Sequence, residues 1–515
     1  MQITQSLHQA VQSRPDQVAT IFGSRTRTVA ETADRVARMA GALRELGVVD
    51  GERVGIYALN SDRYHELLYA VPWAGGVVNP VNSRWSVTEV AYSLVDCGTD
   101  IVLVDDAFAG TVDELRAKAP NLREVIYCGE GETPDGLLSY EDLVAGAELL
   151  EDARRRDEDL YGVYYTGGTT GAPKGVMLDH RALLTSAMGC MVTTDMLSRG
   201  GVLLHAAPMF HLADGAAWNI ANLTHAVHVI VPSFTVAGVV DAIEKHGVTD
   251  ALLVPTMIQA IVDSPEAATA DLTSMQRVMY GASPISESVL NRARATFANA
   301  RFTQAYGMTE LAPVATLLTA DDHDVSSLAR SAGRAAAHAE VRVVGPDDQT
   351  LPRGEVGEIV SRGDHVMQGY WNKPDETAQA LAGGWMHTGD AGYMDADGYL
   401  FVVDRIKDMV ISGGENVYSV EVENALVKHD RIMQAAVVGV PDDTWGERVH
   451  AFLILREGED ITLEEVREWC RQHIANYKLP RSIDVVDSFP VSGAGKVLKR
   501  ELRKEFWGNS DRSIN

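Results

Sequence analysis

The chain has 515 residues and a formal net charge of −27, and 46% of its residues are hydrophobic and 23% charged. This is the composition of an ordinary globular protein, and the length is enough for about three or four domain-sized units. The averaged negative charge excludes nonspecific binding to nucleic acid and to anionic membranes, because a polyanion would need a local basic site. We therefore expect no nucleic-acid partner.

Cysteine spacing and the N-terminus bear on where the protein works. The four cysteines (Cys97, Cys128, Cys190 and Cys470) form no C-x-x-C pair, so we expect reduced thiols and a cytoplasmic location. The first residues have neither the basic nor the apolar segment of a secretory signal. The longest uncharged run, 215–240, contains Asn, His, Pro and Gly, which favours buried strand and loop over a membrane helix. We predict a soluble chain with no transmembrane segment.

Short β-rich apolar runs alternate with helical periodicity from residue 54 to about residue 403. The strands that we expect include 54–59, 101–104, 163–165, 251–254 and 277–280. Capping-box patterns predict helix starts at 28–31, 86–89 and 462–465, because hydroxyl and carboxylate together satisfy two free backbone donors. The alternation predicts an α/β fold: a large N-terminal domain of several subdomains, with parallel-rich sheets flanked by helices.

The clearest punctuation lies near residue 405. Residues 395–398 are typical of a tight turn, 399–403 of a strand, and the charged run 404–408 of a solvated connector. We predict an N-terminal domain of residues 1–404 and a small, mobile α+β domain of residues 405–515. The second has 16 basic and 19 acidic side chains, a net charge of −3, which leaves −24 in the first.

A glycine-rich loop at residues 165–175, YTGGTTGAPKG, follows an apolar strand. Its backbone N–H groups, its hydroxyls and Lys174 could together bind phosphate. The Walker pattern fails, because Pro173 precedes the lysine and Gly175 follows it. An ordinary P-loop ATPase is thus disfavoured, and a flexible surface loop is the alternative.

This loop resembles the signature loop of the adenylate-forming superfamily, which includes acyl-CoA synthetases, peptide-synthetase adenylation domains and luciferases. Four more segments follow in that family's order: AYGMTE at 305–310, WMHTGD at 385–390, DRIKD at 404–408 and GAGK at 493–496. The resemblance covers nearly the whole chain. It implies an enzyme that uses ATP and Mg²⁺ to join a carboxylic acid to AMP. Gly167 departs from the family, which often has Ser there, and this puts one hydroxyl contact to pyrophosphate in doubt.

The resemblance also implies the nucleotide-binding residues. These are Thr166, Gly167, Gly168, Thr169, Thr170, Lys174, Gly281, Ala282, Ser283, Gln304, Ala305, Tyr306, Gly307, Met308, Thr309, Asp390, Val402, Arg405 and Lys496. The phosphates would lie at the glycine loop, and adenine between the 281–283 backbone and the ring of Tyr306. Asp390 and Arg405 would bind the ribose, and Glu310 with Thr166 would bind Mg²⁺.

Catalysis is assigned by the same resemblance to Lys174, His211 and Lys496. Lys496 would bridge the substrate carboxylate and the α-phosphate, so it should act in adenylation alone. The basic side chains that follow it, at 499–504, are typical of a solvated helix. Lys407 would be the hinge about which the small domain turns for the second half-reaction. That turn would bring the CoA-binding residues to the site: Gly413, Gly414 and Asn416.

The predicted acyl pocket consists of His211, Trp218, Thr256, Gly307 and Pro313. His211 stands where amino-acid-activating relatives have Asp, which argues against an amino acid as substrate. Trp218 resembles a tunnel gate of long-chain fatty acyl-CoA synthetases, and core packing is an equal alternative for it. Because the remaining candidates are apolar or small, an apolar acid would fit.

We therefore expect an acid–thiol ligase, an AMP-forming acyl-CoA synthetase that acts on a medium- or long-chain fatty acid or a similar apolar acid. One alternative is an aryl-acid CoA ligase, coumarate- or benzoate-like. A second is a fatty acyl-AMP ligase, although 400–423 leaves little room for the insertion of those relatives. A third is a non-catalytic nucleotide-binding scaffold. The expected partners are the carboxylic acid, ATP and CoA, and a homodimer is left open.

Overall fold

The computed structural model describes residues 1–166, 173–197, 199–283, 285–412, 415–442, 444–491 and 497–507. They form two compact units. The first contains the described residues up to 341 together with 361–386, and the second contains 342–360 and those from 387 onward. The mixed α/β class with a separate C-terminal unit is as predicted, while a domain boundary at residue 404 stays a prediction. No helix in the described part of the chain is long and apolar enough to cross a bilayer.

A nine-stranded sheet, in the order β16-β15-β14-β13-β12-β10-β11-β1-β2, forms one layer of the first unit. Its six central strands, from β14 to β1, are parallel, and β2, β15 and β16 are antiparallel to their neighbours. The strands are β1 (Val18–Phe22), β2 (Arg25–Thr28), β10 (Val202–His205), β11 (Val227–Ile230), β12 (Asp250–Leu253), β13 (Arg277–Gly281), β14 (Arg301–Tyr306), β15 (Thr316–Leu318) and β16 (Arg334–Ala335).

An eight-stranded sheet, in the order β19-β9-β8-β4-β3-β5-β6-β7, forms the other large sheet of this unit. It is parallel from β8 to β7, and the β8–β9 hairpin and β19 add an antiparallel edge. The strands are β3 (Arg53–Tyr57), β4 (Val77–Pro80), β5 (Ile101–Val104), β6 (Glu124–Tyr127), β7 (Leu138–Ser139), β8 (Leu160–Thr166), β9 (Lys174–Asp179) and β19 (Gly369–Tyr370).

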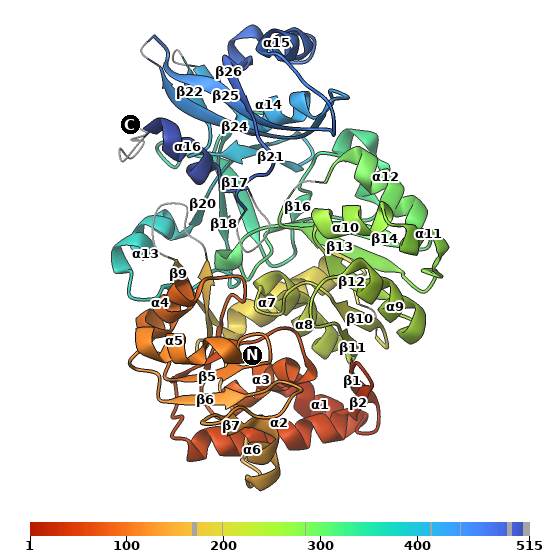
Figure 1. Cartoon of the computed structure of the whole chain (residues 1–515), viewed down its shortest axis with the longest axis vertical. Helices are drawn as coiled ribbons and strands as arrows, with labels where there is room; N and C mark the ends of the chain where they lie inside the picture. Colours follow the sequence, from red (N-terminus) through yellow and green to blue (C-terminus); the bar gives the residue numbers. More distant parts are fainter. Residues whose placement is uncertain are drawn as a thin grey trace. The chain divides into compact units, whose positions relative to one another are not determined.

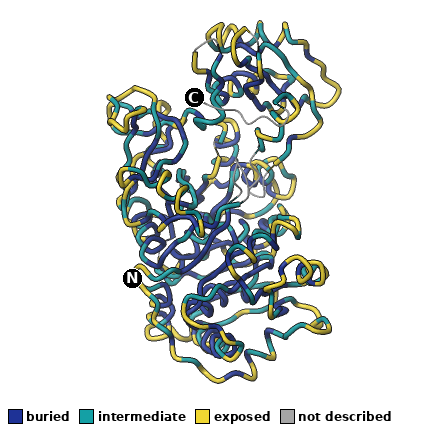
Figure 2. The backbone as a smooth tube through the Cα atoms, turned by 90° about the vertical axis from the view of Figure 1, so that its left-hand side faces the viewer, coloured by how far each residue is buried: buried dark blue, intermediate teal, exposed yellow. Residues whose placement is uncertain are grey.

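Helices cover these sheets, as the ribbon in Figure 1 shows for the first unit. They are α1 (Gln5–Ser13), α2 (Val29–Glu45), α3 (Asp62–Trp73), α4 (Val87–Cys97), α5 (Val112–Lys118), α6 (Tyr140–Gly146), α7 (His180–Thr193), α8 (Leu212–Thr224), α9 (Val236–His246), α10 (Pro255–Val262), α11 (Pro265–Thr269), α12 (Glu287–Thr296) and α13 (Pro374–Ala380). The capping boxes predicted at Thr28 and Ser86 are both formed. Buried residues lie mainly inside the fold, and exposed ones mainly at its outer turns (Figure 2). All four cysteines are free and buried.

Two further sheets make up most of the second unit. The four-stranded one has the order β17-β18-β20-β21, and the other consists of β23-β22-β25-β24 with β26 beside β25. The strands are β17 (Glu340–Val344), β18 (Gly357–Arg362), β20 (Met386–Met394), β21 (Leu400–Arg405), β22 (Val410–Ser412), β23 (Glu415–Val417), β24 (Ile432–Asp442), β25 (Gly446–Leu455) and β26 (Ser482–Val485). The helices are α14 (Ser419–Leu426), α15 (Leu463–Arg471) and α16 (Lys499–Trp507). The predicted capping box at Thr462 begins α15.

Buried charges tie β2 to helices α2, α3 and α6 in the first unit. Asp62 and Glu66 of α3 are 0% and 1% exposed. Arg25 Nε lies 2.6 Å from the Asp62 carboxylate, and Arg35 Nε lies 2.7 Å from that of Glu66. We call the whole group the N-terminal ion cluster: Arg25, Arg27, Arg35, Arg63, Asp62, Glu66, Glu130 and Glu141. Four arginines face four carboxylates, so the group is balanced in charge.

Candidate active site

The carboxyl ends of four neighbouring parallel strands define one edge of the nine-stranded sheet. Strands β10, β12, β13 and β14 lie side by side in parallel register. The loops that leave their ends carry predicted site residues: 206–211, 254–256, 282–283 and 307–309. Ligands of open α/β sheets bind beyond the carboxyl ends of the strands. The fold therefore brings together the candidates for adenine and acyl binding that the sequence spreads over about a hundred residues.

Two glycines let the backbone approach closely at this edge. A Cβ on Gly281 would lie 2.4 Å from the Ala305 carbonyl oxygen, and one on Gly307 would lie 2.0 Å from that of Pro313. Ala282 has φ +66°, a left-handed conformation that costs a non-glycine residue energy and occurs often at functional sites. The ends of β13 and β14 thus form a narrow backbone surface beside the half-buried Tyr306. This geometry fits the predicted flat slot for adenine.

A line of three side chains runs from the edge of the eight-stranded sheet to the segment that follows β14. Thr166 and Lys174 are the last pair of the β8–β9 hairpin, whose loop is the glycine-rich segment. Lys174 Nζ lies 4.8 Å from the centre of the Tyr370 ring, a cation–π contact. The Tyr370 hydroxyl donates to Glu310 Oε1 at 2.9 Å. One tyrosine, which our sequence reasoning missed, thereby contacts both Lys174 and the predicted metal ligand Glu310.

Burial and the negative charge of Glu310 raise the pKa of Tyr370 well above its usual value. Its hydroxyl therefore stays protonated and remains a donor to the carboxylate. The backbone supports the same arrangement, because Trp371 N–H donates to the Gly175 carbonyl at 2.7 Å and Met367 N–H to that of Glu310 at 2.9 Å. Backbone hydrogen bonds before and after Tyr370 thus hold its strand against β9 and against the segment of Glu310.

Glu310 is a suitable ligand for Mg²⁺. It is 6% exposed, and a carboxylate oxygen is the ligand that this hard cation prefers. In the described part of the chain, no cluster of three or more His, Cys, Asp or Glu side chains could hold a metal ion. Mg²⁺ characteristically binds through one or two carboxylates and the phosphates of the substrate. The residues present therefore fit a Mg²⁺ ion that arrives with ATP.

The predicted acyl-pocket residues lie around the start of α8 and the strand-end edge. His211 is the N-cap of α8, and Thr256 is exposed at the second position of α10. Trp218 is 1% exposed, its Nε1 donates to His65 Nδ1 at 2.9 Å, and its ring lies 4.7 Å from that of Tyr69. Trp218 therefore packs in the core, and its role at the acyl pocket stays a prediction.

Helix α8 is joined to the sheet beneath it by a chain of buried hydrogen bonds. His205 of β10 bonds to Asp214 of α8 at 2.7 Å and to His228 of β11 at 2.8 Å. His228 in turn bonds to the Asn222 side chain of α8 at 3.1 Å. Buried polar groups that satisfy one another in this way make a core rigid. The helix that begins at His211 thus has a fixed position on the sheet.

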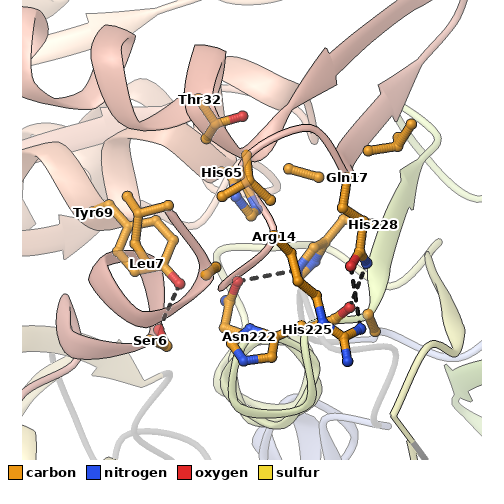
Figure 3. Close-up of a pocket in the computed structure, with 15 residues that line it drawn as sticks. Ser6, Leu7, Arg14, Gln17, Thr32, His65, Tyr69, Asn222, His225 and His228 are labelled. Carbon is orange, nitrogen blue, oxygen red and sulfur yellow. Dashed lines mark hydrogen bonds between the residues drawn. The ribbon is translucent and has the colours of Figure 1, made fainter. Parts of the chain in front are cut away.

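A small cavity lies away from the strand-end edge, where α1, α2 and α3 meet the turn between α8 and β11 (Figure 3). Its volume is about 30 Å³, room for about two water molecules. Asn222 and His228 line it, and the buried Thr32 hydroxyl has no hydrogen-bond partner among the residues described. The cavity fits buried water and is too small for a substrate.

The predicted ribose-binding pair lies within the second unit. Asp390 of β20 and Arg405 of β21 are opposite each other in the sheet, and Arg405 Nε is 3.2 Å from the Asp390 carboxylate. Asp390 is 8% exposed. Val402, also predicted at the nucleotide, is 37% exposed and lies opposite Gly392. A carboxylate held by an arginine is pre-oriented to accept hydrogen bonds from a diol.

The prediction of a solvated connector at 404–408 is wrong. Asp404 is 4% exposed, and its carboxylate accepts hydrogen bonds from the backbone N–H and the hydroxyl of Ser419. Burial, together with the positive Arg405, lowers the pKa of Lys407 to about 8. Since a charge run in the sequence does not reveal its tertiary partners, its burial could not be read from composition.

The prediction of a solvated basic helix at 499–504 is wrong in part. Lys499 and Arg503 of α16 are only 14% and 13% exposed, and they pair with Glu423 at 2.7 Å and with Asp408 at 3.0 Å. Lys504, by contrast, is 67% exposed. One side of helix α16 therefore packs its basic residues against Glu423 and Asp408, and another side presents Lys504 to solvent.

Several predicted residues lie outside the described part of the chain: Gly167, Gly168, Thr169, Thr170, Gly413, Gly414 and Lys496. Their assignments stay predictions. Asn416, the remaining candidate for CoA binding, is exposed in β23 opposite Ile411.

Comparison with known proteins identifies the family of the chain. The AMP-binding enzyme family matches residues 7–371, and the AMP-binding enzyme C-terminal domain matches residues 421–496. The chain therefore belongs to the AMP-binding enzyme family, within the adenylate-forming superfamily.

Individual relatives match nearly the whole length of the chain. The chain is 38% identical to a feruloyl-CoA synthase of Amycolatopsis sp, over 96% of each chain. It is 35% identical to the fatty acid–[acyl-carrier-protein] ligase ScoC of Streptomyces coeruleorubidus, over 99% of this chain and 97% of that one. Among solved structures it resembles the amide bond synthetase McbA from Marinactinospora thermotolerans, with a TM-score of 0.87, 31% identity and 98% and 100% of the two chains covered.

Proposed function

We propose that this protein converts a compact, apolar carboxylic acid to its CoA thioester through an enzyme-bound acyl adenylate. That it is an AMP-forming acyl-CoA ligase follows from its family and its curated relatives. The class of acid is the proposal. The observation that carries it is the strand-end edge: His211, Gly281 and Glu310 lie at or after the carboxyl ends of β10, β13 and β14, and Tyr370 links Glu310 to Lys174.

In the first half-reaction, a carboxylate oxygen of the acid attacks the α-phosphorus of ATP and pyrophosphate leaves. Both partners are anions, so positive charge and orientation supply most of the catalysis. Lys174 would bind the departing phosphates, and Tyr370 would keep Glu310 aimed at its ligand. Mg²⁺, when bound, would neutralise phosphate oxygens at that carboxylate. Thr309, one residue before Glu310, would donate to the α-phosphate.

The acid would lie beside α8, with its carboxylate near His211. This histidine caps the helix, where N–H groups and the positive end of the helix dipole favour an anion. An imidazole in this place offers no charge partner for a substrate ammonium group, unlike the Asp of amino-acid-activating relatives. An uncharged acyl group therefore fits better than an amino acid.

An aryl acid suits the described geometry better than a long acyl chain. A tunnel gate has to swing aside, but Trp218 is held by its bond to His65 and by the ring of Tyr69. The helix that carries it is fixed by the His205 to His228 chain. A fixed tryptophan favours a short, closed pocket. The feruloyl-CoA synthase of Amycolatopsis sp supports this choice, while relatives named for medium- and long-chain acids keep a fatty acid as second candidate.

The second half-reaction is attack of the CoA thiol on the acyl adenylate, which releases AMP. Lys496 would serve only the first step, and the C-terminal domain would turn about Lys407 to exchange the lysine loop for the CoA-binding residues.

The test is a panel of acids with ATP and Mg²⁺, assayed with and without CoA, with products identified by mass spectrometry. The panel contains benzoate, coumarate, ferulate, octanoate and palmitate. We expect AMP, pyrophosphate and an acyl-CoA, with the best kcat/KM for an aryl acid. Best activity with palmitate would overturn the aryl assignment, and acyl-AMP without thioester would overturn CoA as acceptor.

A matched pair of variants ties the activity to the proposed site. Glu310→Gln keeps the shape of the side chain and removes its charge, so acyl-AMP formation should fall by about 10²-fold. Glu340→Gln, an exposed glutamate paired with Arg362, should have no effect. Equal activity of the two variants would contradict the metal-binding role of Glu310.

A further inference from the structure

Lys407 is the predicted hinge residue, and we call it the pivot. Helix α16 contacts the chain on the carboxyl-terminal side of this residue. Arg503 donates to the Lys407 carbonyl at 3.1 Å and pairs with the Asp408 carboxylate at 3.0 Å. The peptide bond between residues 407 and 408 is planar, so that carbonyl and Asp408 move as one piece. Rotation about the backbone bonds of Lys407 would therefore leave both contacts of Arg503 intact.

The amino-terminal side of the pivot belongs to a different sheet. Strand β21 pairs with β20 up to Arg405, and Ile406 N–H donates to the Gly389 carbonyl at 2.9 Å. These bonds fix the chain up to residue 406 on the four-stranded sheet. A turn at Lys407 would carry α14 and α16 away from that sheet while β21 stays in place.

Asp404 makes a contact that crosses the pivot. It lies in β21, three residues before Lys407, and is 4% exposed. Its Oδ2 accepts a hydrogen bond from the Ser419 hydroxyl at 2.7 Å and another from the Ser419 N–H, at the first residue of α14. Lys499 of α16 donates to the same hydroxyl, and its positive charge acts on Asp404. A turn at Lys407 would break this set of bonds.

The cluster can open without leaving an isolated charge in the protein. Lys499 Nζ lies 2.7 Å from Glu423, and Glu423 accepts a hydrogen bond from Val437 N–H at 2.7 Å. All three residues follow the pivot, so they stay together during a turn. Asp404, once released, would be hydrated. The cost of an unpaired buried charge, which makes most buried ion pairs hard to break, is thereby avoided.

We propose that Asp404 is a positioning residue that latches the C-terminal domain to β21 across Lys407, and that this latch opens between the two half-reactions. The proposal rests on the proposed two-step function, because only a domain turn gives the latch a task. We call Asp404, Ser419, Glu423 and Lys499 the hinge cluster. Hydrogen bonds to a charged group are strong enough to bias a two-state equilibrium by about ten-fold or more.

The direct test separates the two half-reactions in Asp404→Asn. One assay measures the single-turnover rate of acyl-AMP formation, and the other the rate at which CoA captures supplied acyl-AMP. Because the latch stabilises one orientation, its loss should change the ratio of the two rates by about ten-fold relative to wild type. Ser419→Ala should shift the ratio in the same direction by less, since the Ser419 N–H remains. An unchanged ratio, or an equal fall of both rates, would overturn the latch.

Arg503→Gln is the matched control. Arg503 lies on the same helix as Lys499, is similarly buried and forms an ion pair of 3.0 Å. Its bonds to the Lys407 carbonyl and to Asp408 do not cross Lys407, so the ratio of the two rates should stay that of wild type even if stability falls. A ratio change equal to that of Asp404→Asn would show that any lost contact near the pivot has this effect, which would contradict the proposal.

A distance measurement tests the latch without relying on catalysis. The natural cysteines are buried, so cysteines introduced at Val192 and Val485, which are 78% and 54% exposed, can carry spin labels. The distance distribution should change in Asp404→Asn and stay as in wild type in Arg503→Gln. An unchanged distribution in Asp404→Asn overturns the latch. Wild-type protein that makes neither acyl-AMP nor thioester overturns the proposed function, and the distances still decide the latch. If Asp404→Asn fails to fold, Ser419→Ala carries both measurements.

Discussion

The N-terminal ion cluster and the hinge cluster, two ionic groups in the described part of the chain, are built in opposite ways. The N-terminal ion cluster balances four arginines against four carboxylates, and Arg25 contacts Asp62 through two of its nitrogens. The hinge cluster has one lysine between two carboxylates, Asp404 and Glu423. The planar guanidinium of arginine, with its donors in fixed directions, fixes the geometry of its carboxylate partners. The ammonium group of lysine is a point charge, which can keep one partner and lose the other. The N-terminal ion cluster therefore suits helices that stay packed together, and the hinge cluster suits a contact that forms and breaks.

The sharpest test of a C-terminal domain that turns about Lys407 is Lys496→Ala. If this lysine serves adenylation alone, acyl-AMP formation should fall by about 10³-fold, because a charge aimed at the transition state is lost. Capture of supplied acyl-AMP by CoA should remain within about two-fold of wild type. Single-turnover assays of each half-reaction measure both. Lys504→Ala, which removes an exposed lysine of α16, is the control, and a parallel fall of both rates would refute the domain turn.

The permanence of the N-terminal ion cluster is tested by Asp62→Asn. This change leaves Arg25 and Arg27 without their shared buried carboxylate, so the free energy of unfolding should fall by about 3 kcal/mol. Urea titration followed by circular dichroism gives the value. Asp34→Asn removes an exposed pair with Arg38 and should cost less than about 0.5 kcal/mol. Similar losses in the two variants would show that the cluster is no stronger than a surface pair.

Low pH should reduce the contribution of the N-terminal ion cluster to the free energy of unfolding. Burial alone would raise the pKa of Asp62, but the hydrogen bonds and charge of Arg25, with the charges of Arg27 and Arg63, outweigh it and bring the pKa below 3.8. A carboxylate with a lowered folded-state pKa stabilises the fold above its unfolded value and loses that contribution as the pH falls through the folded value. Wild-type stability should therefore decline below about pH 4, more steeply than that of Asp62→Asn. Parallel pH profiles of unfolding would contradict this.

The smallest expected effect concerns Tyr370, which holds the first unit's site together. Tyr370→Phe keeps the ring beside Lys174 and removes one hydrogen bond to Glu310. Such a bond contributes about 1 kcal/mol, so acyl-AMP formation should fall about five-fold, with a raised requirement for Mg²⁺. Tyr161→Phe, which loses a buried hydroxyl bond to Leu68, serves as control. A Mg²⁺ dependence equal to that of wild type would remove Tyr370 from the site.

Local signals predicted the elements well. The run 101–104 is β5 to the residue, and all three capping boxes form. These features depend on neighbours within four positions, which a sequence displays directly. The predicted strand 251–254 is shifted by one residue, to Asp250–Leu253.

Side-chain contacts between residues far apart in the sequence could not be predicted. Tyr370 lies in a strand of two residues and contacts a carboxylate 60 positions earlier, so no local pattern marks it. Asp404 seemed solvated because its neighbours in the sequence are charged, yet its partners Ser419 and Lys499 lie 15 and 95 positions onward. Charge patterns give the type of a side chain, while tertiary structure decides whether it faces water.

The burial of the four cysteines has a chemical consequence. Burial raises the pKa of Cys97 and Cys470 to about 11 and that of Cys190 to about 12, and it raises the pKa of Cys128 further. At neutral pH these thiols are un-ionised, and only a thiolate is a strong nucleophile. An acyl adenylate is an electrophile that any accessible thiolate would consume. With its cysteine thiols protonated and enclosed, the described chain offers this reactive mixed anhydride no cysteine nucleophile of its own to compete with the thiol of the co-substrate.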